Sequence, residues 1–242
     1  AKILPLVRAA FDAQGLTDVA LTASDESLVN QAIATWRSFP PELKAIIDQV
    51  NVHGYENPAN ARRAELHRIT RVEDGKRLWN SETGDDDATG LEMAYNIHQD
   101  FFLLHPTAWA YWQPVDGGLN GLGGSGWGLL DAAMLEGGEP RANPKLFVLA
   151  QYSRHIRPGM HIHLGQDPDT VFAVDPAAGK LVIVSLNRAE TAATYAYDLS
   201  ALAKSVAVTG GWLTQPGASV FYQTVASAGE VQGATITVPS PA

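Results

Sequence analysis

Glu82 is the carboxylate whose place in the sequence best suits it to chemistry. It ends an expected short strand within residues 76–85, in which Leu78 and Trp79 are the apolar part, and Gly84 then interrupts the strand. In α/β barrels, a carboxylate at the carboxyl end of a strand, just before the turn into a helix, is typical of a catalytic residue. Taken alone, this stretch is explained equally well by an ordinary polar residue at a strand end.

Further polar side chains follow the neighbouring expected strands. Tyr55, one strand earlier, is placed to donate a hydrogen bond to Glu82, which would keep the carboxylate ionised and fix its rotamer. His53 either does similar work or is a core histidine bonded to the backbone. Asp25 follows the first expected strand, and Gln113 ends the last one.

Aromatic residues are concentrated near the same strand ends, where sugar rings could pack on them. The candidates are Trp79, Trp109, Tyr111, Trp112 and Trp127. Side chains alternate along a strand, so Trp112 and Ala110 are expected to face one way. Trp109, Tyr111 and Gln113 are expected to face the other. Trp112 is the preferred platform because it lies near the strand's end. Carboxylates flanked by aromatic rings suit hydrolysis of a glycosidic bond.

Two other groups suggest metal ions only weakly. The run Asp85, Asp86 and Asp87 is better explained by the preference for Asp at the start of a helix. His161 and His163 alternate on a strand-like piece, but two ligands make a weak metal signal. The sequence therefore predicts no metal site and no cofactor.

Composition excludes several classes of partner. The 242 residues carry a net charge of −9, with 45% hydrophobic and 18% charged residues, which is a normal globular composition. With no basic cluster to neutralise phosphates, neither nucleic acid nor an anionic membrane is expected as a partner. No apolar run approaches the ~18 residues of a membrane span. The absence of cysteine excludes disulfide and thiolate chemistry.

Strands and helices alternate through the first two thirds of the chain. Helices are expected over 2–15, 27–37, 42–48, 59–73, 88–104 and 143–156, and strands over 18–23, 50–53, a stretch ending at residue 82, and 108–113. A glycine-rich loop is expected at 117–126. Such alternation predicts a parallel sheet with right-handed crossovers. A barrel is favoured over a doubly wound sheet, because the glycine pattern of a dinucleotide site is missing and barrel strand ends converge on one face.

The pattern changes near residues 158–165. Short β-rich runs follow at 171–175, 180–187, 194–198, 206–209, 220–224 and 234–238, separated by glycine and proline turn signals. They predict a small antiparallel β-sandwich. The expected domains are therefore a barrel part over 1–160 and a β-sandwich over 161–242.

Several segments resemble glycoside hydrolase family 30. The nucleophile segment of that family is similar to residues 78–85, and the resemblance continues in 52–55, 87–90, 108–114 and 145–159. The block from 78 to 160 is most similar to the endo-β-1,6-galactanase branch. The resemblance implies a (β/α)8 TIM barrel joined to a β-sandwich, and a retaining double-displacement mechanism.

The resemblance also implies roles for individual residues. Glu82 matches the nucleophile, Tyr55 the position that supports it, and Trp112 a wall of the site for the sugar at the cleavage point. His53, Asp25 and Gln113 match positions that line the site. The family's Asn-Glu-Pro segment, which carries the acid/base Glu after the fourth strand, does not occur here. The chain is therefore expected to supply about strands 5–8, with the other half of the barrel outside it as a complementary partner.

The resulting hypothesis is a secreted glycoside hydrolase that cleaves β-1,6-galactan, such as arabinogalactan side chains, with retention. One alternative is the same family acting on β-1,6-glucan, glucuronoxylan or a glycosylceramide. Another is a non-catalytic carbohydrate-binding fragment that lacks a proton donor.

Overall fold

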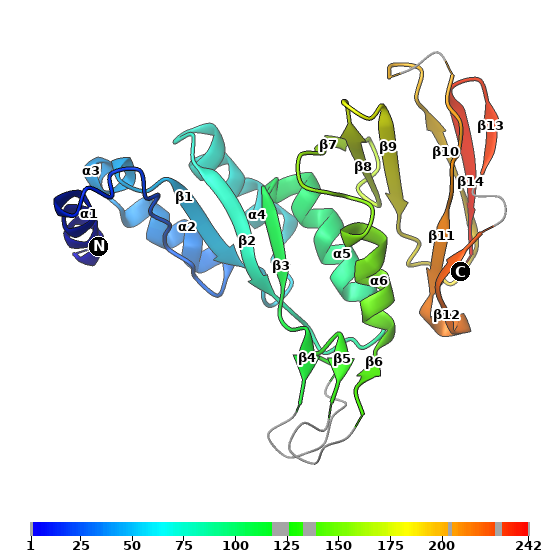
Figure 1. Ribbon diagram of the computed structural model, residues 1–242, viewed down its shortest axis with the longest axis horizontal. Helices are drawn as coiled ribbons and strands as arrows, with labels where there is room; N and C mark the ends of the chain where they lie inside the picture. The colour runs from blue at the N-terminus through cyan, green and yellow to red at the C-terminus, as the bar shows by residue number, and fades with distance from the viewer. Residues whose placement is uncertain (1, 118–125, 133–138, 203–204, 226–228, 242) are drawn as a thin grey trace. The chain divides into compact units, whose positions relative to one another are not determined.

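The computed structural model describes residues 2–117, 126–132, 139–202, 205–225 and 229–241. The chain divides into two compact units (Figure 1). Unit 1 contains Ala1–Asp85 and Asn96–Pro114, and unit 2 contains Asp86–Tyr95 and Val115–Ala242. The fold is therefore described one unit at a time.

Unit 1 is built on a parallel sheet of β1 (Gln49–His53), β2 (Arg77–Thr83) and β3 (Ala108–Tyr111), in that order. The strands predicted at 50–53, before residue 82 and from 108 onward are confirmed. The strand predicted at 18–23 is reduced to an isolated parallel bridge between Thr22 and Gln49 of β1, and a second bridge joins Glu26 to Val52. Asp25 lies between them at φ 67°, a left-handed conformation that interrupts an extended ladder.

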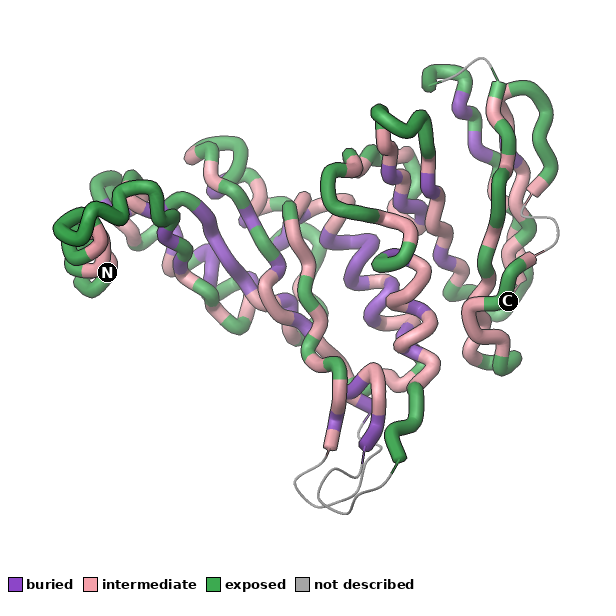
Figure 2. The backbone as a smooth tube through the Cα atoms, viewed as in Figure 1, coloured by how far each residue is buried: buried purple, intermediate pink, exposed green. Residues whose placement is uncertain are grey.

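Helices α2 (Val29–Ser38) and α4 (Asn60–His67) pack on one face of this sheet. The chain also forms α1 (Ile3–Ala13), α3 (Pro41–Ala45), the π-helical turns η1 (Arg68–Val72) and η2 (Asp100–Leu104), and α5 (Leu91–Gln99), whose residues are divided between the two units. The predicted helices 59–73 and 88–104 therefore each end in a π-helical turn. Trp36 of α2 and Leu66 of α4 pack on Val52 and Leu78 of the strands to form the buried core (Figure 2).

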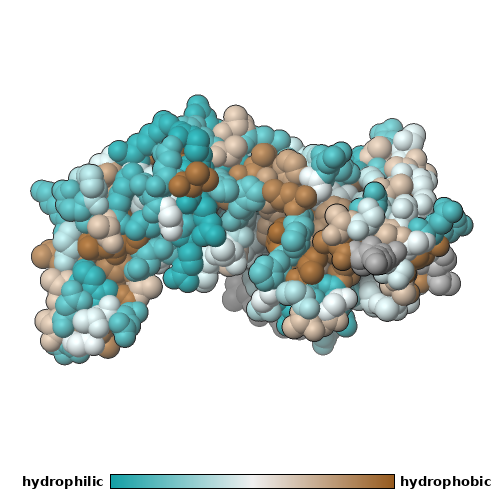
Figure 3. All heavy atoms as spheres, turned by 90° about the horizontal axis from the view of Figure 1, so that it is seen from above, coloured by the Kyte–Doolittle hydropathy of each residue, from teal (hydrophilic) through white to brown (hydrophobic). Residues whose placement is uncertain are grey.

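The opposite face of the sheet is more exposed on β2, where Trp79 is exposed, than on β1, where its neighbour Asn51 is buried. Seen from above, apolar residues reach the molecular surface among polar ones (Figure 3). The described strands of unit 1 form a three-stranded sheet and not a closed barrel. The predicted set of four barrel strands is therefore only partly present in this fold.

From Val115 onward, unit 2 consists first of short strands and a helix. β4 (Val115–Asp116), β5 (Leu130–Asp131) and β6 (Arg141–Ala142) form a small mixed sheet that was not predicted, followed by α6 (Pro144–Ser153). The glycine-rich loop predicted at 117–126 lies outside the described residues except at its two ends. The predicted helix 143–156 corresponds to α6.

The rest of unit 2 is antiparallel, as predicted. The strands are β7 (His161–Leu164), β8 (Thr170–Asp175), β9 (Lys180–Ser185), β10 (Ala193–Asp198), β11 (Trp212–Gln215), β12 (Val220–Thr224), β13 (Glu230–Gln232) and β14 (Thr235–Ser240), with the 3-10 turn η3 (Pro216–Ala218). They pair as β7-β8-β9, β10-β14-β13 and β11-β12. Phe172 and Ile183 of the first group pack against the cluster of Tyr197 and Ile236 in the second, so their apolar faces share one core.

One predicted strand in this region is wrong. Residues 206–209 form no strand, although Val206 and Val208 pack against the same apolar cluster. Their alternating apolar residues therefore reflect a loop that covers the core, without a ladder of backbone hydrogen bonds. The division between domains near residue 160 stays a prediction.

Candidate active site

Glu82 lies near the carboxyl end of β2, at the edge of the sheet where β1 and β3 also end. Its side chain is 32% exposed, so the carboxylate is reachable from solvent yet held by its surroundings. Oε1 of Glu82 accepts a hydrogen bond of 2.7 Å from the hydroxyl of Tyr55. The hydrogen bond predicted from the sequence is therefore present.

Gly54 explains why Tyr55 comes so close. A Cβ atom at Gly54 would lie 2.6 Å from Nδ2 of Asn80 and 2.9 Å from Oγ1 of Thr83, so a larger residue has no room there. The amide of Gly54 also donates a hydrogen bond of 2.9 Å to the backbone carbonyl of Glu82. The turn after β1 is thus drawn against β2, and the next residue in the chain, Tyr55, faces the carboxylate.

Tyr55 is a permanent donor under ordinary conditions. Burial, the hydrogen bond to Glu82 and the negative charge of that carboxylate together raise the pKa of Tyr55 well above its usual value. The phenol therefore stays protonated at neutral pH and remains a hydrogen-bond donor. An anionic oxygen that accepts this bond is stabilised without the transfer of a proton.

His53 lies between two carboxylates. Its Nδ1 is 3.4 Å from Oε1 of Glu82, and its Nε2 is 3.5 Å from Oδ1 of Asp25. Within the described part of the chain, Nδ1 is buried without a hydrogen-bond partner. Its ring also meets the ring of Tyr55 edge-on, with centroids 5.7 Å apart. Of the two interpretations of His53, a place beside the carboxylates fits this geometry, and a backbone-bonded core position does not.

Asp25 belongs to the same group of side chains. Its Oδ1 accepts a hydrogen bond of 2.6 Å from the hydroxyl of Ser81, the residue that precedes Glu82. The same hydroxyl lies 3.3 Å from the carbonyl of Val52 on β1. Ser81 was missed by the sequence analysis, because nothing in its type or spacing separates it from a solvated strand residue.

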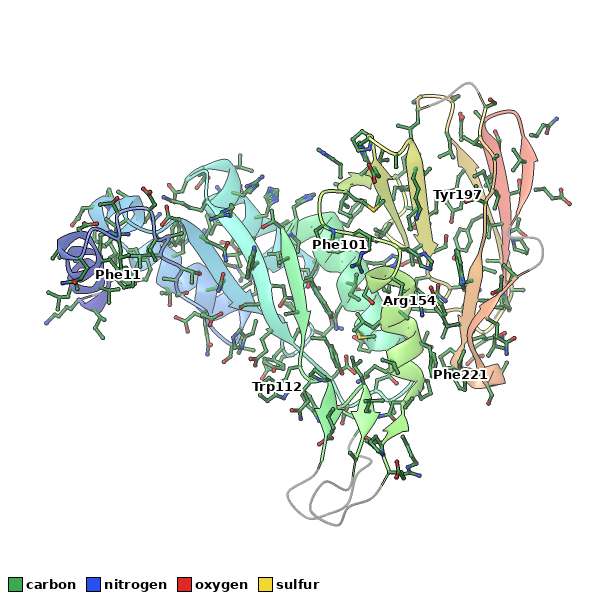
Figure 4. The ribbon with its side chains drawn as sticks, viewed as in Figure 1. Phe11, Phe101, Trp112, Arg154, Tyr197 and Phe221 are labelled. Atoms are coloured by element: carbon green, nitrogen blue, oxygen red, sulfur yellow. The ribbon has the colours of Figure 1, made fainter. Side chains whose placement is uncertain are left out.

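Trp112 and Gln113 lie just beyond the end of β3. The strand ends at Tyr111, so the alternation predicted along 108–113 does not extend to these two residues. The amide of Trp112 donates to the carbonyl of Thr83 over 2.7 Å, and its side chain is 46% exposed (Figure 4). An indole anchored next to the end of β2 and open to solvent is available for stacking, while Gln113 is half-buried.

Two other aromatic candidates have structural partners instead. Nε1 of Trp109 donates to the buried carboxylate of Asp100 over 2.9 Å. The hydroxyl of Tyr111 lies 3.4 Å from the carbonyl of Asp85. Their ring planes are stacked, with centroids 6.2 Å apart. These contacts assign Trp109 and Tyr111 to the packing around the site.

The acidic run before α5 caps the helix. Asp87 accepts hydrogen bonds from the amides of Thr89 and Glu92, over 2.9 and 3.0 Å. Burial of Asp87 opposes ionisation, but these bonds and the charge of Lys145 outweigh it and lower the pKa of Asp87. The capping interpretation is therefore confirmed for this residue. Among the residues that the structure describes, no group of three or more His, Asp or Glu side chains is arranged to hold a metal ion.

The arrangement as a whole suits chemistry at an electrophilic carbon. A carboxylate at a strand end, bonded by a neutral phenol and bordered by an exposed indole, can act as a nucleophile or a base toward a sugar ring. These are the features of a carbohydrate-active enzyme. Residues 1–154 match glycosyl hydrolase family 59, and the chain belongs to this GH30/GH59-like group of glycoside hydrolases.

Comparison with individual proteins agrees with this assignment. The chain is 38% identical over 227 residues to an endo-β-1,6-galactanase of Hypocrea rufa, covering 92% of this chain and 45% of that protein. Its fold is similar to the catalytic domain of GH30 xylanase C from Talaromyces cellulolyticus, with a TM-score of 0.74, 18% identity and coverage of 99% and 53%. It is also similar to a GH30 endoxylanase of Clostridium papyrosolvens C71, with a TM-score of 0.69, 20% identity and coverage of 94% and 55%.

The chain thus spans about half the length of the relatives it matches. Within its described residues, no helix is long and apolar enough to cross a membrane.

Proposed function

We propose that this chain carries the nucleophile of a retaining glycoside hydrolase that cleaves β-1,6-linked galactan, such as the side chains of arabinogalactan. The observation that carries the proposal is the 2.7 Å hydrogen bond from Tyr55 to Glu82 at the end of β2. The substrate is suggested by the 38% identity to an endo-β-1,6-galactanase.

In this mechanism an oxygen of Glu82 attacks the anomeric carbon, and the glycosidic oxygen leaves with a proton from a second carboxylic acid. Water, deprotonated by that second carboxylate, then releases the sugar from Glu82 with overall retention. Tyr55 holds the nucleophile in one rotamer through its hydrogen bond. Trp112 forms a wall of the sugar site, and His53, Asp25 and Gln113 line it.

The second carboxylic acid is assigned to a Glu outside these 242 residues. The sequence contains no Asn-Glu-Pro segment, and the chain covers 45% of the matching galactanase. We therefore propose a (β/α)8 barrel in which this chain supplies about strands 5–8, followed by a β-sandwich over 161–242. The complementary half of the barrel is the expected partner, and secretion is expected for an enzyme of plant polysaccharides.

The test is an assay of the full-length protein on β-1,6-galactan, β-1,6-glucan, glucuronoxylan and a glycosylceramide, with the first product anomer read by NMR. Cleavage of the galactan with retention is expected, and Glu82→Gln should abolish turnover while sugar binding survives. Tyr111→Phe is the matched control, since it alters a hydroxyl that contacts a backbone carbonyl.

Each contrary outcome has a distinct meaning. Cleavage of another polymer on the panel would replace the substrate and keep the mechanism. Inversion, or turnover by Glu82→Gln near the wild-type rate, would remove Glu82 from the proposed role. Sugar binding without cleavage of any polymer would favour the non-catalytic carbohydrate-binding alternative.

A further inference from the structure

The strand that carries Glu82 contains one more residue than its neighbour β1. Asn80 lies opposite Val52, and Glu82 lies opposite the very next residue of β1, His53. Ser81 therefore has no counterpart on β1. Such an extra residue is a β-bulge, which bends the strand and redirects its side chains.

The same extra residue is present relative to β3. Asn80 lies opposite Trp109, and the next recorded pair joins Thr83 to Tyr111, with a shift of register between them. β2 advances one residue more than β3 over this interval. Asn80 is thus the last residue of β2 in regular register with both neighbours.

Burial along β2 reveals what the bulge does to Glu82. Leu78 and Asn80 face the buried side of the sheet, and Trp79 faces the exposed side. Strict alternation would bury Glu82 and expose Thr83. The reverse is observed, since Thr83 is buried and Glu82 is partly exposed. The bulge therefore turns the carboxylate to the open face.

A buried carboxylate fixes the position at which the bulge begins. Oδ2 of Asp100, at the start of η2, accepts hydrogen bonds of 2.7 Å from Nδ2 of Asn80 and 2.9 Å from Nε1 of Trp109. These donors are partners across the two strands. Oδ2 of Asp100 thus binds both Asn80 and Trp109, which are the last pair of residues in regular register before the bulge.

The charge of Asp100 is balanced inside the protein. Nε of Arg63 donates to its Oδ1 over 2.8 Å, and Arg63, Asn80 and Asp100 are each 1% exposed. Nη2 of Arg63 donates to Asn96 over 2.7 Å, on the side of the network away from the strands. A charge buried in this way is stable only while its partners stay in place.

Asn80 also touches the turn that carries Tyr55. Its amide nitrogen lies where a Cβ on Gly54 would be 2.6 Å away. Among the described residues, its Oδ1 is buried without a hydrogen-bond partner, so the bond to Asp100 is what orients the amide. A shift of Asn80 would therefore move both Glu82 and the residue before Tyr55.

We infer that Asp100 is a positioning residue for the nucleophile: through Asn80 and Trp109 it holds the bulge in β2 that aims Glu82 at the substrate. The inference rests on the proposed function, because it concerns the aim of Glu82 as nucleophile. According to this inference, Asp100, Asn80 and Trp109 contribute to catalysis by positioning Glu82, without contacting the substrate.

The test measures how fast Glu82 becomes covalently labelled in the full-length protein. The probe is the 2-deoxy-2-fluoro glycosyl fluoride of the disaccharide from whichever polymer the enzyme cleaves. A carboxylate oxygen of Glu82 forms a bond to the anomeric carbon, the carbon–fluorine bond breaks and fluoride leaves. This step needs no proton donor, so it reports on the nucleophile alone.

Two variants weaken the connection without removing the buried charge of Asp100. Trp109→Phe deletes one donor and keeps an aromatic ring, and Asn80→Leu deletes the other at similar volume. Asn96→Ala is the matched control, because it removes a hydrogen bond from the same network but leaves β2 and β3 untouched. Thermal unfolding is measured for all of them.

Both strand variants are expected to label about 10- to 100-fold more slowly, as a nucleophile displaced by about 1 Å would. Their affinity for the probe before labelling should change less than about threefold. Asn96→Ala should lose comparable stability and label at nearly the wild-type rate. If Asn80→Leu does not fold, Trp109→Phe carries the test.

Wild-type labelling rates in the strand variants, or an equal loss in Asn96→Ala, would overturn the inference and leave the proposed function intact. Full-length wild-type protein that cleaves no polymer of the panel, or that cleaves one but takes no label on Glu82, would overturn the proposed function and this inference with it.

Discussion

At the scale of single residues, Tyr55 positions Glu82 through a direct hydrogen bond. Its hydroxyl donates a hydrogen bond to Oε1, and its raised pKa keeps it protonated at neutral pH. Hydrogen bonds to charged groups contribute about 1.5–3 kcal/mol, roughly twice the neutral kind. Removal of this one oxygen atom should therefore affect the site more than the fold.

Tyr55→Phe is predicted to lower kcat by about 10- to 100-fold, which corresponds to the loss of one such bond. The phenyl ring keeps the edge-on contact with His53, so thermal stability should change little. Steady-state kinetics on the cleaved polysaccharide provide the measurement. A kcat within twofold of wild type would show that Tyr55 does not support the nucleophile.

At the scale of elements, the ends of α4 and η2 meet through two histidines. His67 lies in the last turn of α4 and His105 follows η2, and their ring centroids are 4.3 Å apart. Burial, the neighbouring His105 and Arg71 lower the pKa of His67 from its usual value to about 4. Burial and Arg71 lower the pKa of His105 as well. The helix layer behind the sheet thus favours neutral histidines.

This contact predicts an acid-sensitive helix layer. The unfolded chain takes up a proton at His67 near its usual pKa of 6.5, and the folded chain only near 4. The contribution of His67 to stability is therefore present above about pH 6.5 and is lost as the pH falls toward 4. Urea unfolding of wild type and His67→Gln from pH 4 to 8 tests this.

The variant should lose less stability on acidification than wild type, by on the order of 1 kcal/mol once screening by solvent is allowed for. Between pH 7 and 8 the two proteins should depend on pH alike, which serves as the internal control. Parallel curves through the whole range would mean that this histidine pair does not make the fold sensitive to acid.

At the scale of the whole molecule, the parallel sheet of unit 1 and the antiparallel sheets of unit 2 follow different rules of construction. The parallel strands are separated by helices, and the ends of β1 and β2 bring His53 and Glu82 together, with Asp25 of the preceding segment beside His53. The antiparallel strands of β7–β9, β10, β13 and β14 enclose their own apolar cluster. Among the described residues the parallel sheet has three strands and does not close, so the proposed barrel requires further strands from its complementary half.

A structure of the full-length protein is therefore predicted to place the acid/base carboxyl group about 5–5.5 Å from that of Glu82. That separation lets one carboxylate attack the carbon whose oxygen the other protonates. Crystallography provides the measurement. A separation of about 6.5–9.5 Å would leave room for a water molecule and would contradict retention.

Much of unit 1 could be predicted because its signals are local. A short apolar run before Glu82 gives β2, helical spacing gives α2 and α4, and the resemblance to family 30 in the segments around Tyr55 and Trp112 points to the site. The strand expected over 18–23 is reduced to a bridge at Thr22. Asp25, just after it, has a left-handed backbone beside β1, and no local sequence pattern indicates these contacts. The run at 206–209 failed for the related reason that apolar alternation also suits a loop packed on a core.

By itself, the sequence determined the class of elements, their order and the residue types that end the strands, because hydrophobic periodicity and turn residues act over a few neighbours. It also determined the family, through runs such as 78–85. Only the tertiary structure decided which way Glu82 points. That direction depends on an extra residue in β2, and on hydrogen bonds that Asn80 and Trp109 both donate to Asp100. These contacts join segments that are distant in the sequence, so no local pattern reveals the register of the three strands.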